Sequence, residues 1–157
     1  MSTRCDRPVE LSDSPANTSP HSDPPLEAPT YAGPMSPRNL ADVFAGFETT
    51  WEPRIVARVN DYDVRVAKVE GEHTWHSHAD TDEFFLVLNG RFTVDLRNAE
   101  PVVLEAGDTY VVPRGVEHRP RAEPGTRILM FEPDGTPSTG DQGPVDHLPS
   151  TTGIDLG

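Results

Sequence analysis

The pattern of apolar and polar positions predicts one folded region between two polar ends. From Arg54 onward, short apolar runs recur at regular intervals and are separated by Gly, Pro, Asn or Asp. Many short runs with regular turns indicate the antiparallel strands of a sandwich or barrel. The clearest strand is 92–97, where apolar and polar residues alternate strictly. The predicted strands are 55–59, 64–69, 74–78, 83–88, 92–96, 102–104, 109–112 and 127–131.

A different period precedes the strands. Ser36 and Pro37 have the residue types of a helix N-cap followed by the first helical position. After them, apolar residues follow the i, i+3, i+4, i+7 spacing that places side chains on one face of a helix: Leu40, Val43, Phe44 and Phe47. We therefore predict a short amphipathic helix at about 37–46 that packs on the core.

The two ends of the chain lack such periodicity. Residues 1–36 are rich in Pro, Ser, Asp and Thr, and a segment of this composition cannot offset its ordering entropy by burial. We expect it to be disordered. Residues 136–157 return to a similar composition, and we expect a tail that is flexible or covers the barrel. The folded domain is assigned to 37–135.

Composition narrows the possible partners and compartment. The formal net charge is −13, from 13 basic and 26 acidic residues, without a basic cluster that could bind a nucleic acid. Cys5 is the only cysteine, which excludes an intramolecular disulfide and favours the reducing cytoplasm. No apolar stretch is long enough for a membrane span or a signal peptide. Lys68 is the only lysine, an arginine bias that suggests a bacterial source.

Four residues have the spacing of metal ligands. His76 and His78 are two apart in a strand-like run, so both imidazoles should project from one face. Glu83 follows a short polar turn that can bring its carboxylate back beside them. His118 comes just after a strand bounded by glycines and proline, whose fixed turns should aim it inward. Three imidazoles and one carboxylate suit a divalent transition metal and leave coordination positions open.

Nearby residues offer alternatives. Asp82 could replace Glu83, but parity places Glu83 on the strand face of the apolar residues that follow it. His73 is an odd number of residues from His76 and should face away. His21 is isolated and is expected to be solvated. Four further side chains are weaker candidates for a pocket, because such residues mostly form core or dimer interface: Tyr110, Phe85, Trp75 and Arg121.

These residues resemble the two motifs of the cupin family, over about 38–135. The stretches concerned are Gly71-x4-His76-x-His78-x4-Glu83-x6-Gly90 and Gly107-x5-Pro113-x-Gly115-x2-His118. Two departures, a spacer of four rather than five residues before His76 and Ala122 in place of a common Asn, do not fall on ligands. The resemblance implies an all-β fold, a double-stranded β-helix or jelly-roll barrel, with one metal ion held by the four matched residues. It also implies a homodimer formed through the outer sheet surface.

The resemblance limits the reaction without selecting it, because small cupins include dioxygenases, isomerases, cyclases, lyases and binding proteins. We expect a metal-dependent enzyme acting on a small organic molecule, in a lyase, isomerase or rearrangement step of specialised metabolism. The alternatives are an Fe(II)-type dioxygenase and a non-catalytic metal-binding or ligand-binding cupin. The cofactor is expected to be one divalent ion of Fe, Mn, Zn, Ni, Co or Cu.

Overall fold

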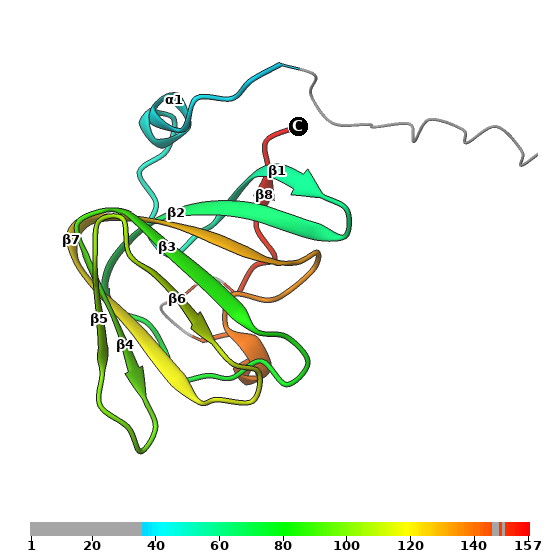
Figure 1. Cartoon of the computed structure of the whole chain (residues 1–157). Coiled ribbons are helices and arrows are strands. Elements are labelled where there is room, and N and C mark those ends of the chain that lie inside the picture. The colour runs from blue at the N-terminus through cyan, green and yellow to red at the C-terminus, as the bar shows by residue number, and fades with distance from the viewer. Residues whose placement is uncertain (1–35, 146–147, 149) are drawn as a thin grey trace, which may run out of the picture. The chain divides into compact units, whose positions relative to one another are not determined.

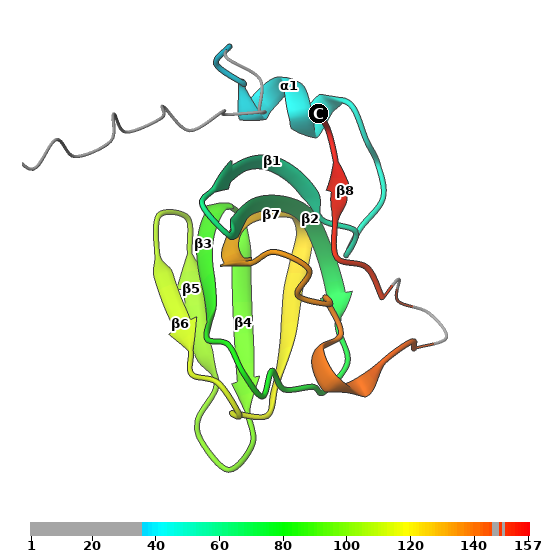
Figure 2. The ribbon, with the colours of Figure 1, turned by 90° about the vertical axis from the view of Figure 1, so that its right-hand side faces the viewer.

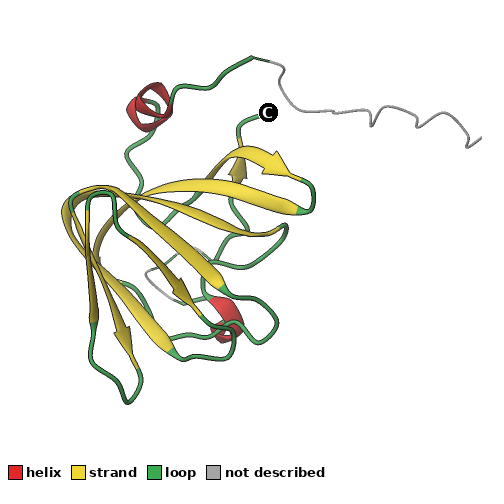
Figure 3. Cartoon of the chain, viewed as in Figure 1, coloured by secondary structure: helices red, strands yellow, loops and turns green. Residues whose placement is uncertain are grey.

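The computed structural model describes residues 36–145, 148 and 150–157 (Figures 1 and 3). Residues 1–35, which hold His21 and nearly all of the segment predicted to be disordered, lie outside the described residues. The described residues form one helix, eight strands and one 3-10 helix. Their bounds are α1 Leu40–Ala45, β1 Arg54–Val59, β2 Tyr62–Glu72, β3 Glu83–Asn89, β4 Arg91–Leu96, β5 Val102–Glu105, β6 Thr109–Val112, β7 His118–Pro133, η1 Gly140–Gln142 and β8 Ile154–Asp155.

The strands form one curved sheet organised around β7. Its order is β5-β4-β7-β2-β1-β8, and β3 pairs with both β7 and β6. The first part of β7 pairs with β4 and its last part with β3, so this 16-residue strand belongs to both halves of the sheet (Figure 2). Gly125, at a φ of 81°, lies between these two parts. No ladder among the described residues closes the sheet, because β5, β6 and β8 remain edges; the predicted barrel is therefore a curved open sheet.

The main hydrophobic core fills the concave side of this sheet. Along β3 the buried residues alternate with half-buried or exposed ones, as the period of a strand requires. In β4 the four consecutive residues 92–95 are all buried. Phe85 and Phe92 are almost fully buried there, and their ring centroids are 5.0 Å apart. Leu148 from the C-terminal region joins the same cluster. Burial of this apolar surface is the main favourable contribution to folding.

Helix α1 covers part of the opposite face. Figure 2 shows the helix lying beside β1. Its buried residue, Phe44, packs with Val56 of β1 and Val66 of β2, so the predicted apolar stripe is a packing face. The helix starts later than we predicted. Its N-cap is Asn39, whose Oδ1 accepts a hydrogen bond from the backbone N–H of Ala41 at 2.8 Å. An asparagine side chain in this position satisfies a free helix N–H, a role that the sequence pattern had assigned to Ser36.

The predicted strand 74–78 is absent. This segment contributes only an isolated bridge between His76 and His118. Strand β2 instead continues to Glu72, where it pairs with Arg121 of β7. The chain then leaves the continuous ladder before reaching His76, and separate backbone hydrogen bonds to residues distant in the sequence hold it instead.

The described C-terminal residues lie against the sheet. Strand β8 pairs in parallel with β1, with Arg54 opposite Ile154. Before it, the backbone N–H of Ser138 donates to the carbonyl of Thr151 at 2.9 Å, which joins two parts of this region. Within the described part of the chain, no helix is both long and apolar enough to cross a membrane.

Candidate metal centre

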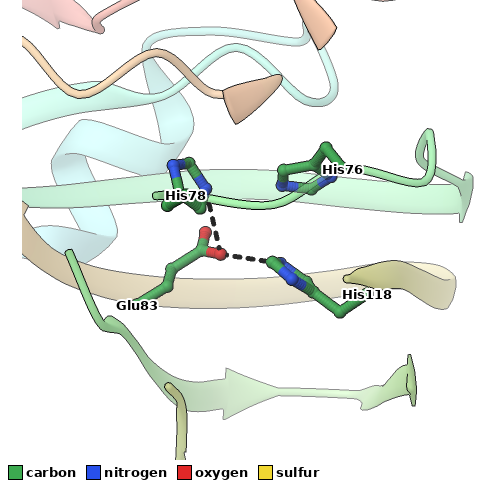
Figure 4. A group of neighbouring side chains, drawn as sticks. All are labelled: His76, His78, Glu83 and His118. Carbon is green, nitrogen blue, oxygen red and sulfur yellow. Dashed lines mark hydrogen bonds and ion pairs between the residues drawn. The ribbon is translucent and has the colours of Figure 1, made fainter. Parts of the chain in front are cut away.

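Four buried side chains meet at one end of the interior (Figure 4). His76 and His78 come from the segment between β2 and β3, Glu83 is the first residue of β3, and His118 is the first residue of β7. One potential ligand atom from each lies within 4.8 Å of those of the other three. The structure thus brings together all four residues that the sequence indicated, and this cluster could hold a metal ion.

The backbone fixes the two histidines that no strand holds. The N–H groups of His76 and His118 each donate to the carbonyl of the other, at 3.0 and 2.9 Å. The N–H of Gly115 donates to the carbonyl of His78 at 2.8 Å. Gly115 has a φ of 74°, a backbone conformation that glycine adopts without strain. The turn before β7 therefore positions three of the four side chains at once.

Backbone carbonyls also orient two imidazole rings. Nδ1 of His76 lies 3.0 Å from the carbonyl oxygen of Thr74, and Nδ1 of His118 lies 2.9 Å from that of Val116. A carbonyl can only accept, so both Nδ1 atoms carry a proton, and when these imidazoles are neutral their lone pairs are on the Nε2 atoms. Nε2 of His76 is buried and has no hydrogen-bond partner among the described residues. A buried nitrogen left in this state fits a metal ligand.

The separations of the donor atoms fit one ion. Oε2 of Glu83 lies 2.9 Å from Nε2 of His118 and 3.4 Å from Nε2 of His78. Ligands about 2.1 Å from a metal are separated by about 3 Å at octahedral angles and by about 3.4 Å at tetrahedral angles. Two acceptor atoms at 2.9 Å also need a proton or a cation between them. The donor set and its spacing therefore fit a divalent transition metal.

Burial and mutual contact shift the pKa values of the cluster. Burial lowers the pKa of His76 to about 4, which keeps its imidazole neutral at neutral pH. For His78, burial acts downward but the Glu83 carboxylate outweighs it and raises the pKa. For Glu83, burial acts upward but is outweighed by His118 and His78, which hold its pKa well below its usual range. The cluster thus retains an ionised carboxylate that can balance a bound cation.

A small cavity adjoins the cluster. Its volume is about 30 Å³, enough for about two water molecules. The wall includes His76 and Glu83 together with apolar residues of β2, β3 and β7. A larger cleft of about 410 Å³ lies on the other side of His78, between the 79–81 loop and the segment that follows β7. His78 lines this cleft, whereas His76 and Glu83 line the small cavity.

The structure decides between Glu83 and Asp82, the two acids considered for the cluster. The Asp82 side chain is half exposed and accepts a hydrogen bond from the backbone N–H of Arg114 at 2.9 Å, away from the cluster. His73, expected to face away, is buried instead: its ring centroid lies 5.1 Å from that of His76, and it lines the cavity. The N–H of His73 still donates to the carbonyl of Pro120, which continues the register of β2 with β7, but His76 lies opposite His118, one residue later than that register would give. The strand parity used for His73 fails because of this extra residue.

The weaker candidates divide between the cavity and other surfaces. Phe85 lines the cavity, whereas Tyr110 packs against the core. Trp75 lies under the guanidinium of Arg97, 4.0 Å from its ring centroid, and is absent from the cavity wall. Arg121 pairs with Asp95 of β4.

Sequence reasoning missed two cavity residues. Trp51 has a positive φ of 57° and donates from its indole N–H to the carbonyl of Glu70 at 2.7 Å. Glu132, near the end of β7, is 3% exposed. One feature of the sequence could have identified Glu132. It lies two residues after Met130, so its side chain would point to the same inward face if the strand predicted to end at 131 continued.

Gly140 holds the C-terminal region directly against the cluster. A Cβ at this position would overlap the carbonyl oxygen of Ser77 and would lie 3.0 Å from Cδ2 of His76. Its φ of 51° is also one that other residues rarely adopt. The N–H of the next residue, Asp141, donates to the same Ser77 carbonyl at 2.9 Å. Glycine is therefore required for this close approach.

Gly140→Ala is expected to weaken metal binding by roughly tenfold or more, because residues that orient a ligand have effects of this size. Competition with a chelator measures it. Gly143→Ala is the matched control, since its φ of 69° imposes a similar backbone strain but its Cβ would meet no atom within 4 Å. Equal affinities in the two variants would show that the contact with His76 does not matter.

Comparisons with known proteins agree with this fold. Residues 62–131 match the Cupin_2 family, described as "Cupin domain". The crystal structure of a cupin-2 domain containing protein from Shewanella frigidimarina NCIMB 400 is 45% identical, with a TM-score of 0.59, and covers 61% of this chain and 93% of its own. The chain therefore belongs to the cupin family.

Two further matches are one curated protein and one solved structure. The uncharacterized protein YdbB of Bacillus subtilis (strain 168) is 43% identical over 77 residues, which are 49% of this chain and 68% of that protein. The hydroquinone 1,2-dioxygenase PnpCD, solved in complex with Cd²⁺ and 4-hydroxybenzonitrile, is 22% identical, with a TM-score of 0.54 over 67% of this chain and 81% of its own. At that identity the second likeness concerns the fold alone.

Proposed function

We propose that His76, His78, Glu83 and His118 hold one divalent transition-metal ion and that the chain is an enzyme acting on a small organic molecule. The observation that carries this proposal is the convergence of four buried donors, including the unpartnered Nε2 of His76. Bound there, the ion would supply Lewis-acid chemistry at a substrate carbonyl, carboxylate or hydroxyl.

The preferred reaction class is a lyase, isomerase or rearrangement step. The chain's own contribution is a largely apolar wall beside the cluster, which excludes water and strengthens every electrostatic contact with a ligand. Phe85, Ile128 and Met130 belong to this wall. Neutral His76 and ionised Glu83 leave the site with a carboxylate charge that matches a cation rather than a free anion.

An Fe(II)-type dioxygenase is the second candidate. Three imidazoles and one carboxylate are ligands that iron accepts, and the cavity beside the cluster has the volume of about two water-sized molecules. Oxygen and one substrate atom would fit that space. We further propose a bacterial cytoplasmic homodimer on the strength of the family resemblance.

Elemental analysis of protein purified without a metal-affinity tag tests the proposal. We expect about one ion per chain; a loading clearly above one would contradict a single site. Zinc would favour the Lewis-acid reaction and iron the oxygen-dependent one. Loss of turnover under anaerobic conditions identifies the dioxygenase, and stoichiometric ligand binding without turnover would identify a binding protein instead.

Metal should be retained near neutral pH and released on acidification, because protons compete for the same lone pairs. The pKa of His78 is raised and that of His76 is lowered to about 4, so the imidazole of His78 takes up a proton before that of His76. Release should therefore extend over roughly pH 6.5 to 4. Metal analysis after dialysis at stepped pH measures it.

The same shifts predict the pH dependence of the metal-free protein. The pKa of His76 is lower in the folded chain than in the unfolded one, so its contribution to stability is complete above about pH 6.5 and is lost as the pH falls toward 4. The lowered pKa of Glu83 acts in the same direction at lower pH, and the raised pKa of His78 acts oppositely. At neutral pH the chelated protein should keep its β-sheet circular dichroism and melt at a lower temperature. Loss of the β signal on chelation would make the metal a purely structural element.

A further inference from the structure

We propose that residues 136–142 form a movable strap between the small cavity and the larger cleft, and that an organic ligand reaches the cluster only when this strap swings aside. The strap includes the 3-10 helix η1. This inference rests on the proposed metal site, and it concerns how a ligand gains access to that site.

The cavity beside the cluster is too small for an organic ligand. Its volume of about 30 Å³ holds about two water molecules, whereas binding sites for small organic molecules usually measure roughly 300–1,000 Å³. The cleft of about 410 Å³ has that size, but of the four cluster residues it is His78 that lines it. His76 and Glu83 line the cavity instead. A ligand that contacts the ion therefore needs the volume of the cleft and the donors of the cavity together.

The strap contributes to the walls of both spaces. Ser138 lines the cavity. Four neighbours of Ser138 line the cleft: Thr136, Pro137, Gly140 and Asp141. Because residues of one short segment face both spaces, this segment is a thin partition between them. Its displacement would join the cleft to the cavity and give one pocket of ligand size beside the donors.

Polar contacts, rather than apolar burial, hold the strap in place. Its sequence, Thr-Pro-Ser-Thr-Gly-Asp-Gln, contains no large apolar side chain. On the cluster side, Asp141 donates from its N–H to the carbonyl of Ser77 at 2.9 Å, and its Oδ2 accepts from Oγ of Ser77 at 3.1 Å. On the other side, the N–H of Ser138 donates to the carbonyl of Thr151 at 2.9 Å. Segments with few buried apolar contacts open locally at low cost in free energy.

Two glycines bracket the strap. Gly135 precedes it and Gly143 follows it, with φ values of 78° and 69°. At both positions a Cβ would meet no atom of the described residues within 4 Å, so the backbone has room to turn. Hinges absorb large changes of φ and ψ in a few such positions. Arg65 donates from Nη1 to the carbonyl of Thr136 at 2.8 Å, which makes the start of the strap its more fixed end.

Binding kinetics of benzohydroxamic acid, a planar metal ligand much larger than the cavity, test the strap. The full chain is loaded with Co²⁺, whose visible absorption changes when a ligand joins the ion, and is mixed with the probe by stopped flow. Because opening must precede binding, the observed rate should level off at high probe concentration. Asp141→Ala removes the side-chain bond to Ser77 and should raise this limiting rate about two- to tenfold, the effect of one hydrogen bond. Asp134→Ala is the matched control and should leave it unchanged, because Asp134 is an exposed acid of the same cleft that lies outside the strap.

A disulfide between the strap and the cluster segment gives a second test. Ser77→Cys and Asp141→Cys are combined with Cys5→Ser, which leaves these two thiols alone in the chain. The contact of 3.1 Å between the native side chains places the new thiols within reach of each other. The disulfide is closed in metal-free protein, Co²⁺ is then loaded, and one sample is measured before and after reduction. The oxidised form should fail to bind the probe in the time in which the reduced form is saturated, and both forms should have the same cobalt spectrum.

The possible outcomes separate the strap from the metal site. Equal binding of the probe by the oxidised and reduced forms overturns the strap, and so does failure of the probe to bind the reduced, cobalt-loaded form. Where the disulfide does not form or alters the cobalt spectrum, the kinetics decide: a rate proportional to probe concentration throughout, and equal in wild type and Asp141→Ala, overturns the strap as well. Absence of bound cobalt in the wild-type protein would instead refute the metal site itself.

Discussion

His118→Ala is expected to lower the affinity for the metal ion by at least roughly 100-fold, because even partners that only orient a ligand can cost that much. Nε2 of His118 lies 2.9 Å from Glu83, and its side chain is essentially fully buried. Among the described residues, the cluster then keeps three donors: His76, His78 and Glu83. Metal content after gel filtration and competition with a chelator measure the loss, and His76→Ala should behave alike.

Variants of Glu83 and of its neighbour Asp82 provide a matched comparison in the same measurement of metal content. Glu83→Gln removes the buried carboxylate of the cluster and should release the ion, whereas Asp82→Asn alters a half-exposed side chain that bonds the backbone of Arg114. His21→Ala changes a residue outside the described part of the chain and should have no effect. Full retention of metal by Glu83→Gln together with loss in Asp82→Asn would reassign the carboxylate ligand.

Arg65→Met is expected to lower the free energy of unfolding by about 3–5 kcal/mol, the usual effect of removing one partner from a buried ion pair. Arg65 is completely buried and pairs with Asp63 and Glu132 at 3.0 and 3.1 Å. Methionine fills similar space but leaves two buried carboxylates without their shared cation. Urea unfolding of the metal-free protein measures the change.

An exposed arginine supplies the comparison. Arg91 pairs with Glu105 at 3.4 Å, and both side chains are about half exposed or more. Solvent and salt screen such pairs, so Arg91→Met should change the unfolding free energy little. Similar losses for the two variants would mean that burial of the Arg65 network does not determine its contribution.

The all-β class and the four clustered residues could be predicted because both depend on local sequence. Strict alternation in β4 and the fixed spacing of His76, His78, Glu83 and His118 can be seen without knowing which strands are neighbours. The predicted strand at 74–78 was wrong because local sequence does not determine how this segment is held. Its histidines are held by single backbone bonds to distant residues, and those bonds have no periodic signature.

The remaining cavity residues depend on register, which the sequence does not specify. Glu132 stands opposite Asp63 only through the β2–β7 ladder, and its proximity to Glu83 comes from a second ladder. Trp51 reaches the cavity from a residue with positive φ before β1, a conformation that its amino-acid type does not suggest. Such neighbours can be recognised only once the strands are paired.

The reciprocal backbone bonds between His76 and His118 couple two donors mechanically. When one of these peptide groups separates, the other loses its partner too, so the two imidazoles leave the cluster in one event rather than independently. The residence time of a bound ion is then governed by how often the start of β7 opens, not only by the strength of each bond to the ion. Changes in the backbone near Gly115 would alter that frequency, and exchange of the ion could speed up by orders of magnitude with every donor atom still present.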